Sequence, residues 1–283
     1  MSDKLLALVD GSIYSKSVCD HAAWLADRAG WGIEILHVIG RRDIGHLDLS
    51  GSIALGARSA LLAELSELDE TQARLSREKG RAILEEAEAI VRQHGVSSVN
   101  SRLMSGDLVE TLVEAEAGAA IVVVGKRGEA ADFAKMHLGS NVERVVRSSS
   151  RPVLVASRAF QPIQSVLVAF DAGPSVMKAI DHICGNRAFA GLDIRLLTAG
   201  NENAEVRAKL ESVSARLRGA GHSVVAEVKP GQPEQVIADE VEKSGADLLV
   251  MGAYGHSRIR NLFIGSTTSE MIRSCKIPVL LFR

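Results

Sequence analysis

The feature that most constrains the fold of this chain is an internal repeat. The segment Gly106–Val155 aligns with the segment Gly231–Leu281, and in each a glycine stands 13 positions before a proline. The beginnings of the two copies also match, because one apolar run ends at Asp10 (LLALVD) and another ends at Asp171 (SVLVAFD). Self-similarity over this length predicts one structural unit that is present twice in tandem.

The repeat divides the chain into two unequal halves, residues 1–158 and 163–283, and the total length suits two domains of roughly 150 residues each. The strand-end aspartate and the glycine that begins the aligned segment are 96 positions apart in the first half and 60 in the second, an insertion of 36 residues (96 minus 60). The insertion, mostly Ala54–His94, is rich in Ala, Leu and Glu and has no proline, which favours a long helix or a helical pair. We expect it to provide extra helical cover or an interaction surface, without catalytic content.

Short apolar runs alternate with helical patterns in both halves, which predicts an α/β fold. Continuous apolar strands joined by amphipathic helices are typical of parallel sheets with helices on both faces. We therefore predict two tandem doubly wound domains, each with a five-stranded parallel sheet and flanking helices. The predicted strands are Leu5–Val9, Ile33–Val38, Val99–Leu103, Ala120–Val124 and Pro152–Ala156 in the first half, and Val166–Phe170, Asp193–Leu197, Ser223–Val228, Asp247–Met251 and Ile277–Phe282 in the second.

The composition excludes several classes of protein. Lys and Arg total 33 against 35 Asp and Glu, and a near-neutral chain with 4% aromatic residues argues against a nucleic-acid binder. The apolar runs are too short for a membrane helix, which needs roughly 18 residues, and the N-terminal run is too short for a signal peptide. The three cysteines (Cys19, Cys184 and Cys275) form no CxxC motif and are expected in core positions. We expect a cytoplasmic protein that binds neither nucleic acid nor membrane.

Chemistry is expected at the carboxyl ends of the strands, because ligands of open parallel sheets bind there, where the strand order reverses. Asp10 and Asp171 each close the first strand of their half. Such an aspartate can be a turn former or a helix cap. It can equally accept hydrogen bonds from the ribose or the base of a nucleotide, and its recurrence in both halves favours that second reading.

A glycine-rich segment follows the fourth strand of the second half. Gly252 and Gly255 are separated by two residues, and nine more precede Gly265, Ser266 and Thr267. Glycine lets backbone N–H groups approach an anion closely. A helix that begins directly after it favours phosphate through its dipole and its unpaired N–H groups. Tight strand-to-helix turns would explain the same glycines without any ligand.

The first half carries a similar segment. Gly125 and Gly128 are separated by two residues, and ten more precede Gly139, Ser140 and Asn141. Neither half contains the phosphate-binding loop GxxxxGK[ST] or the dinucleotide motif GxGxxG. The segments are therefore a different kind of candidate phosphate site.

Both segments also fit helix capping boxes, in which a hydroxyl and a carboxylate three residues later bind each other's backbone N–H groups. The pairs are Thr267 with Glu270 and Ser140 with Glu143. These hydroxyls thus have a structural explanation beside the functional one.

The stretch GAYGHSRIRNLFIGSTT resembles the G-x2-G-x9-G-[S/T] signature of the universal stress protein family. The flanking GQPEQVI, the closing IPVLLF and the opening VLVAFDAG are similar to that family too. The resemblance covers nearly the whole chain as a tandem pair. It implies a five-stranded parallel α/β domain in each half and, in part of the family, ATP bound across the sheet edge.

The resemblance implies a nucleotide site in the second half. The strand-end aspartate would meet the ribose or adenine, the first glycine pair would border the triphosphate, and the last glycine with its two hydroxyls would hold phosphate oxygens. An alanine stands where the family often has a valine beside the adenine. The implied site residues are Asp171, Ala199, Gly252, Gly255, Gly265, Ser266 and Thr267.

A second, weaker site is implied in the first half. Its spacer has ten residues rather than nine, and Asn141 replaces one hydroxyl. Glu129 and Asp132 add negative charge to the loop that would face phosphate, while Lys126 and Arg127 add positive charge. We expect this site to be weaker or lost. Its residues are Asp10, Val38, Gly125, Gly128, Gly139 and Ser140.

The function predicted from these features is that of a stress-response protein that binds ATP or another adenine nucleotide, with or without Mg²⁺, as a regulatory ligand mainly in the C-terminal half. No catalytic residue and no metal-ligand set is predicted, because neither a GxSxG motif nor a metal-binding His spacing occurs. Two alternatives stay open, a slow ATPase and an interaction scaffold with vestigial sites.

The partners follow from the same features. The resemblance implies that the apolar last strands, RPVLVA and IPVLLF, pair with each other, and because an unpaired apolar edge promotes aggregation we expect the two halves to form an internal pseudo-dimer. The sequence leaves open a homodimer and a protein partner of unknown identity.

Overall fold

The computed structural model of the protein describes residues 4–40, 57–128, 140–253 and 265–283. The first half runs β1 (Lys4–Leu8), α1 (Ser15–Ala29), β2 (Gly32–Gly40), α2 (Ala57–Gln93), β3 (Val99–Gly106), α3 (Leu108–Ala115), β4 (Ala119–Gly125), α4 (Ser140–Ser148) and β5 (Val153–Ala156). The second half runs β6 (Ser165–Ala169), α5 (Pro174–Gly185), a 3-10 turn η3 (Arg187–Phe189), β7 (Asp193–Ala199), α6 (Ala204–Gly219), β8 (Val224–Lys229), α7 (Pro233–Ser244), β9 (Leu248–Gly252), α8 (Ser266–Ser274) and β10 (Val279–Phe282). Each of the ten predicted apolar runs coincides with one of these strands.

Local sequence explains where these helices begin and end. Proline occupies the first turn of α5 and of α7, where its missing N–H costs nothing. Gly30 ends α1 with φ 74° and Gly245 ends α7 with φ 65°, left-handed positions that favour glycine. These residues therefore set where the helices begin and end between successive strands.

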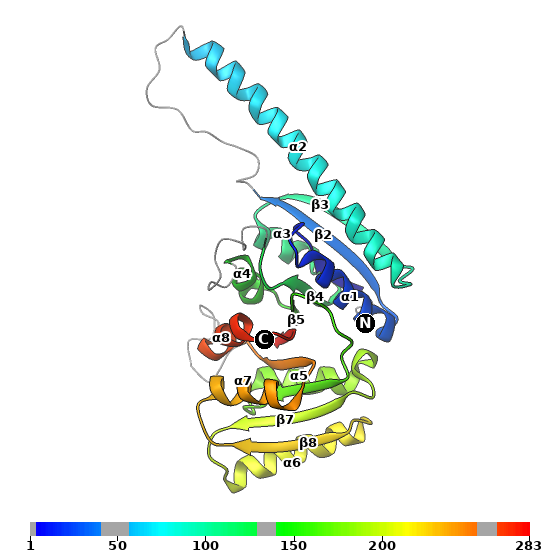
Figure 1. Ribbon diagram of the computed structural model, residues 1–283, viewed down its shortest axis with the longest axis vertical. Coiled ribbons are helices and arrows are strands. Elements are labelled where there is room, and N and C mark those ends of the chain that lie inside the picture. Colours follow the sequence, from blue (N-terminus) through cyan, green and yellow to red (C-terminus); the bar gives the residue numbers. More distant parts are fainter. Residues whose placement is uncertain (1–3, 41–56, 129–139, 254–264) are drawn as a thin grey trace.

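The strands form one continuous ten-stranded sheet in the order β3-β2-β1-β4-β5-β10-β9-β6-β7-β8 (Figure 1). Pairs within each half are parallel, and each half has the doubly wound order. The two halves join where β10 pairs antiparallel with β5, with Val279 opposite Val155 and Leu281 opposite Val153. The predicted fold class is confirmed, and the predicted pairing of the two last strands is present. The exact domain boundaries at residues 158 and 163 stay a prediction.

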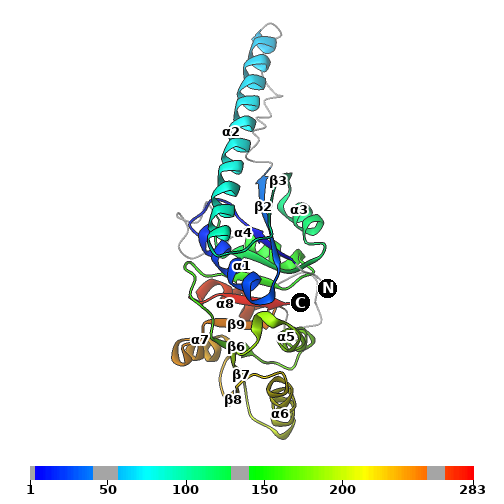
Figure 2. The ribbon, with the colours of Figure 1, turned by 90° about the vertical axis from the view of Figure 1, so that its right-hand side faces the viewer.

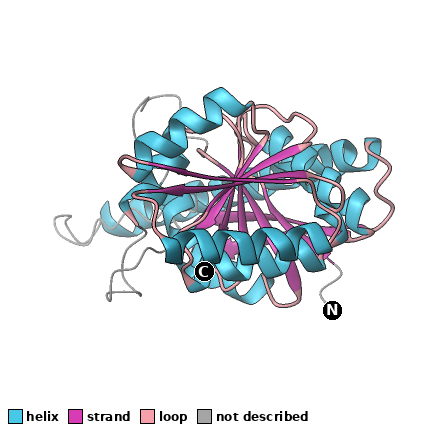
Figure 3. Cartoon of the chain, turned by 90° about the horizontal axis from the view of Figure 1, so that it is seen from below, coloured by secondary structure: helices cyan, strands magenta, loops and turns pink. Residues whose placement is uncertain are grey.

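Helices cover both faces of the sheet (Figure 3). Apolar side chains of α1, α2, α5 and α6 pack on one face, and those of α3, α4, α7 and α8 pack on the other. Two of the three cysteines, Cys19 and Cys275, are buried in these layers as predicted, and Cys184 packs at the edge of the first. Burial raises the pKa of Cys19 to about 12 and that of Cys275 to about 11, so neither thiol is reactive at neutral pH. No helix in the described part of the chain is long and apolar enough to cross a membrane.

The insertion of the first half forms one long helix, α2, of 37 residues rather than a helical pair. Its C-terminal part packs on the sheet, where Leu84, Ala87 and Val91 are buried. Gly80 marks the point of close approach, because a Cβ there would lie 2.7 Å from Leu103 and 3.0 Å from His37. The N-terminal part projects beyond the carboxyl edge of the first half (Figures 1 and 2).

The β5–β10 pairing predicts the behaviour of an isolated first half. Expressed alone, residues 1–158 would expose an apolar edge strand, which promotes association with another chain. We expect this fragment to self-associate or aggregate, as measured by light scattering, while circular dichroism reports that it is folded. A stable, folded and soluble monomer would contradict the view that the two halves need each other's last strand.

The stability of the fold should also depend on His182 of α5, whose ring contacts those of Phe189 and Phe282. Burial lowers the pKa of His182 from 6.5 to about 4. Below pH 6.5 the unfolded chain therefore binds a proton that the folded chain rejects, so stability falls as the pH drops through this window. We expect His182 to reduce the free energy of unfolding by about 1 kcal/mol between pH 7.5 and 5.5.

Urea unfolding of the wild type and His182→Gln at both pH values tests this. The variant should lose that part of the pH dependence, even if it is less stable throughout. An unchanged difference between the two pH values would show that His182 is not the responsible group.

Candidate functional site

The topology places a crevice in each half. In the second half β6 lies between β9 and β7, so the chain reverses its direction of travel across the sheet beside β6. The first half has the same arrangement, with β1 between β4 and β2. Ligands of doubly wound sheets bind at the carboxyl ends of such strands. Because β5 and β10 are antiparallel, the direction of the strands reverses between the two halves at this pair.

The same turn follows the first strand in both halves. Asp171 Oδ1 accepts a hydrogen bond from Gly173 N at 2.8 Å, and Asp10 Oδ1 accepts one from Ser12 N at 3.0 Å. The residue between is left-handed in each case, Gly11 with φ 77° and Ala172 with φ 58°. Both aspartates thus stabilise a turn, which is the first of the two roles that the sequence analysis considered for them. Asp171 is also exposed at the carboxyl edge, so the ligand reading stays compatible with its position.

The start of α8 is tied to the end of β9. Thr268 Oγ1 donates to the carbonyl oxygen of Gly252 at 3.1 Å, and Gly265 N donates to that of Ala253 at 3.3 Å. Gly252 and the segment Gly265–Thr267 therefore lie close together, although twelve residues separate them along the chain. Gly255 falls outside the described residues.

The predicted capping box of α8 is wrong. Gly265 is the N-cap and makes no side-chain capping hydrogen bond, so Thr267 is the second residue of the helix rather than its cap. Thr267 Oγ1 instead donates to Glu234 Oε1 at 2.7 Å, and Glu270 pairs with Arg273. The other predicted box begins at Ser140, whose side chain lies outside the described part.

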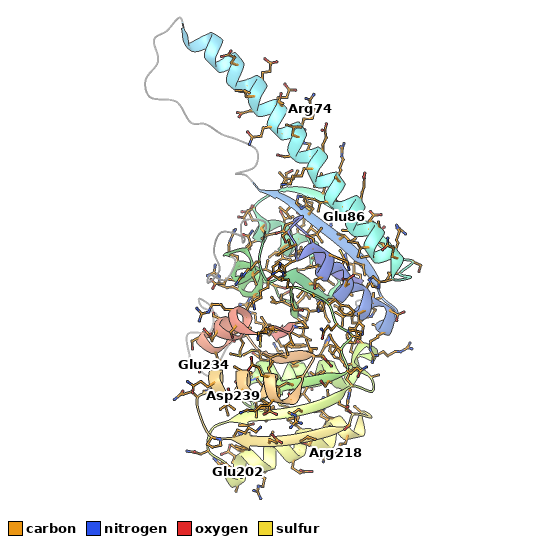
Figure 4. All side chains as sticks on the ribbon, in the orientation of Figure 1. Arg74, Glu86, Glu202, Arg218, Glu234 and Asp239 are labelled. Carbon is orange, nitrogen blue, oxygen red and sulfur yellow. The ribbon has the colours of Figure 1, made fainter. Side chains whose placement is uncertain are left out.

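Glu234 is a residue of this region that the sequence analysis missed. It lies in the first turn of α7, beside α8 (Figure 4). The hydrogen bond from Thr267 holds the pKa of the Glu234 carboxyl below its usual range, so this group stays charged. The only signal in the sequence was an acidic residue after Pro233, which is also what a helix start favours by itself.

Ala199 ends β7 next to this crevice. The neighbouring Thr198 Oγ1 donates to the carbonyl oxygen of Phe170, which links the ends of β7 and β6. Beyond Ala199 the surface is open, since a Cβ built on Gly200 would meet no described atom within 4 Å. The structure thus brings Asp171, Ala199, Gly252 and Gly265–Thr267 to one edge of the second half.

The first-half residues are also gathered, but more tightly. A Cβ on Gly128 would lie 2.9 Å from Asp10 Oδ2, and one on Gly125 would lie 2.7 Å from Tyr14. Val38 lies near the carboxyl end of β2 and is half-buried. Gly139, Glu129 and Asp132 lie outside the described residues.

Two contacts of the first half have no counterpart in the second. Ile83 of α2 lies against the turn after β1, because a Cβ on Gly11 would lie 2.7 Å from its side chain. The ammonium of Lys126 is already used within the protein, since its Nζ donates to the carbonyl oxygen of Cys275 at 2.7 Å. Burial lowers the pKa of Lys126 to about 8. Ala253 occupies the equivalent position in the second half.

Comparison with known proteins identifies the family of this chain. The universal stress protein family matches residues 1–157 and 182–283, which are most of both halves. The chain belongs to the universal stress protein family. It is of the tandem type, because a relative from Synechocystis sp., the universal stress protein Slr1230, is 37% identical and is aligned over 99% of each chain.

A solved structure that matches the full chain agrees on the fold. A universal stress protein from Archaeoglobus fulgidus has a TM-score of 0.75 and 22% identity, with 100% of this chain and 99% of that chain covered. A shorter universal stress protein, crystallised in complex with cAMP, is 27% identical over 43% of this chain and 97% of its own, with a TM-score of 0.37.

Other places in this universal stress protein offer less to a ligand. A shallow hollow lined by Ser165, Asp193, Ser223 and Ser244 lies at the amino ends of β6–β8, the edge opposite the glycine-rich turn. Among the described residues, no group of three or more His, Cys, Asp and Glu side chains is placed to hold a metal ion. The carboxyl edge of the second half is therefore the strongest candidate site.

Proposed function

We propose that this universal stress protein binds ATP or a related adenine nucleotide at the carboxyl edge of its second half. The supporting observation is that two helices, α5 and α8, begin beside the crevice with glycine N-caps, Gly173 and Gly265, that make no side-chain capping bonds. By contrast, α3 is capped by Asp107, which accepts from Val109 N and Glu110 N. Backbone donors without a capping side chain, at the positive end of a helix, are suited to phosphate.

The rest of the edge suits the nucleoside part. Exposed Asp171 offers a carboxylate for the ribose or the adenine, and Ala199 with the open space at Gly200 leaves room for a flat base. Mg²⁺ would arrive with the triphosphate and be held through its oxygens. In this proposal Gly252, Gly265 and Ser266 bracket the phosphates.

The first half is proposed to bind more weakly or not at all. The Ile83 side chain takes up space beside the turn at Gly11, and the ammonium of Lys126 donates to the carbonyl oxygen of Cys275 at the end of α8. These contacts add to the longer spacer and the acidic residues of the loop. The asymmetry thus has a steric and an electrostatic cause.

The ligand is proposed to be regulatory, as a state signal in a cytoplasmic stress response. A nucleotide that binds one conformation better than another shifts the population toward that conformation. The surface that is presented to a partner protein changes with it. Phosphate release by purified protein, lost in a site variant, would instead assign the protein as a slow ATPase.

Calorimetric titration of ATP into wild type, Gly265→Val and Gly139→Val tests the site and its asymmetry. We expect one site in the wild type, which Gly265→Val removes because the new side chain occupies the space of a phosphate. The matched change at Gly139 should leave binding intact. ADP, AMP and cAMP in the same series rank the ligands, and circular dichroism confirms folding.

Two outcomes would contradict the proposal. Equal loss from both substitutions, or two equivalent sites in the wild type, would show that the halves bind alike. Absence of binding by every nucleotide would favour an interaction scaffold with vestigial sites.

The two hydroxyls at the start of α8 should differ in importance. Thr267 is already bonded to Glu234, whereas Ser266 is exposed at the helix start. A hydrogen bond to a charged phosphate contributes roughly 1.5–3 kcal/mol, so Ser266→Ala should weaken ATP binding by roughly ten- to a hundredfold. Thr267→Val should weaken it less, as measured by the same titration. The reverse order would show that Thr267 leaves Glu234 when nucleotide binds.

A further inference from the structure

The projecting part of α2 is not buried by the part of the chain that the structure describes. From Glu64 to Lys79, no residue whose side chain is described is buried, and burial begins at Gly80 (Figure 2). Helices in proteins owe most of their stability to packing of an amphipathic face, and isolated segments of this length are marginal in water. A surface that covers this part is therefore expected.

An apolar stripe lies on this projecting part. Leu68 and Leu75 are 64% and 55% exposed, the two most exposed large apolar side chains in the described part of the chain. Seven residues apart, they lie on one face of the helix. The buried Leu84 comes nine residues after Leu75, which places it on roughly the opposite side of a helix with 3.6 residues per turn. The stripe therefore faces away from the sheet.

The charges of α2 are divided along its length. Between Glu64 and Arg81 the acidic residues come first and the basic residues follow, with Glu78 as the one acidic residue among the latter. They are Glu64, Glu67, Asp69 and Glu70, then Arg74, Arg77, Lys79 and Arg81. A second copy of the same helix is complementary to this pattern only when it runs antiparallel, because a parallel copy would place like charges together.

We propose that two copies of this chain associate through antiparallel pairing of their α2 helices. Leu68 and Leu75 form the apolar contact, and Glu67 of one copy lies near Arg74 of the other. Each of these charged residues directly precedes a leucine of the stripe, so both lie on the same flank of it. Arg74 points outward from the projecting part of the helix (Figure 4).

The rest of the fold supports this surface. The strand edge at β5 is already paired with β10 of the same chain, so it is not free for a second copy. A two-fold interface uses the same patch on both partners, which a self-complementary helix provides. The proposal is independent of nucleotide binding.

Sedimentation equilibrium of the full chain at several concentrations is the first test. We expect a dimer of twice the 30.2 kDa of one chain, which Leu68→Asp with Leu75→Asp converts to a monomer. Val113→Asp is the control, because Val113 is 51% exposed on α3, away from the stripe. A wild type that is monomeric at every concentration overturns the proposal, and so does a leucine variant that still dimerises.

Charge reversal tests the antiparallel geometry. Arg74→Glu alone and Glu67→Arg alone should each weaken the dimer by roughly three- to tenfold, since every reversal acts at two symmetric contacts. An equimolar mixture of the two variants should form heterodimers at least as tight as the wild type. A mixture that stays as weak as either variant overturns the pairing. Leucine variants that lower only the unfolding temperature, without changing the mass, would assign the stripe to residues 41–56 of the same chain.

Discussion

The antiparallel pairing of β5 with β10 is the contact on which the rest of the structure depends. Both strands are four residues long and every residue in them is buried. As free edges they would be an aggregation hazard, and each instead satisfies the other's backbone groups. The same pairing reverses the strand direction between the halves and joins the two candidate crevices into one continuous sheet.

The two copies of the repeat have diverged on a preserved framework. The turn after the first strand keeps its left-handed residue in both, although the second half uses Ala172 where the first uses Gly11. A non-glycine residue there costs about 1–2 kcal/mol, so surrounding contacts must hold it. A charged position in the second strand has changed sign: Glu34 pairs with Lys4 and Arg102, whereas Arg195 pairs with Glu227 and Glu240. The two halves have therefore kept the same backbone geometry and the same pairing of opposite charges more closely than they have kept individual residues.

The sequence predicted those features that depend on local patterns. Apolar runs located all ten strands, and the proline-free insertion located the long α2, because periodicity and propensity act over neighbouring residues. Side-chain contacts between distant elements escaped prediction. Thr267 was predicted as a cap, yet its hydroxyl donates to Glu234, and Lys126 was expected to add positive charge to the loop, yet its ammonium donates to the carbonyl oxygen of Cys275. Ile83 on Gly11 depends on where an inserted helix lies, which no local pattern encodes. Of the implied site residues, Gly255 and Gly139 remain outside the described part.

Two of the three helices of the second half that begin without a side-chain cap lie beside the crevice, and the third is α7, which follows β8. After β7, the strand one step from the crevice, α6 is capped by Asn203, which accepts from Val206 N. After β6 and β9, the strands on either side of the crevice, α5 and α8 begin with glycine N-caps that lack a side-chain acceptor. A side-chain cap typically stabilises a helix by about 1 kcal/mol, so its loss at both flanking helices lowers stability at the same place. An anion that accepts these donors would recover that stability, which is a physical reason for the proposal that phosphate binds in the crevice between β6 and β9.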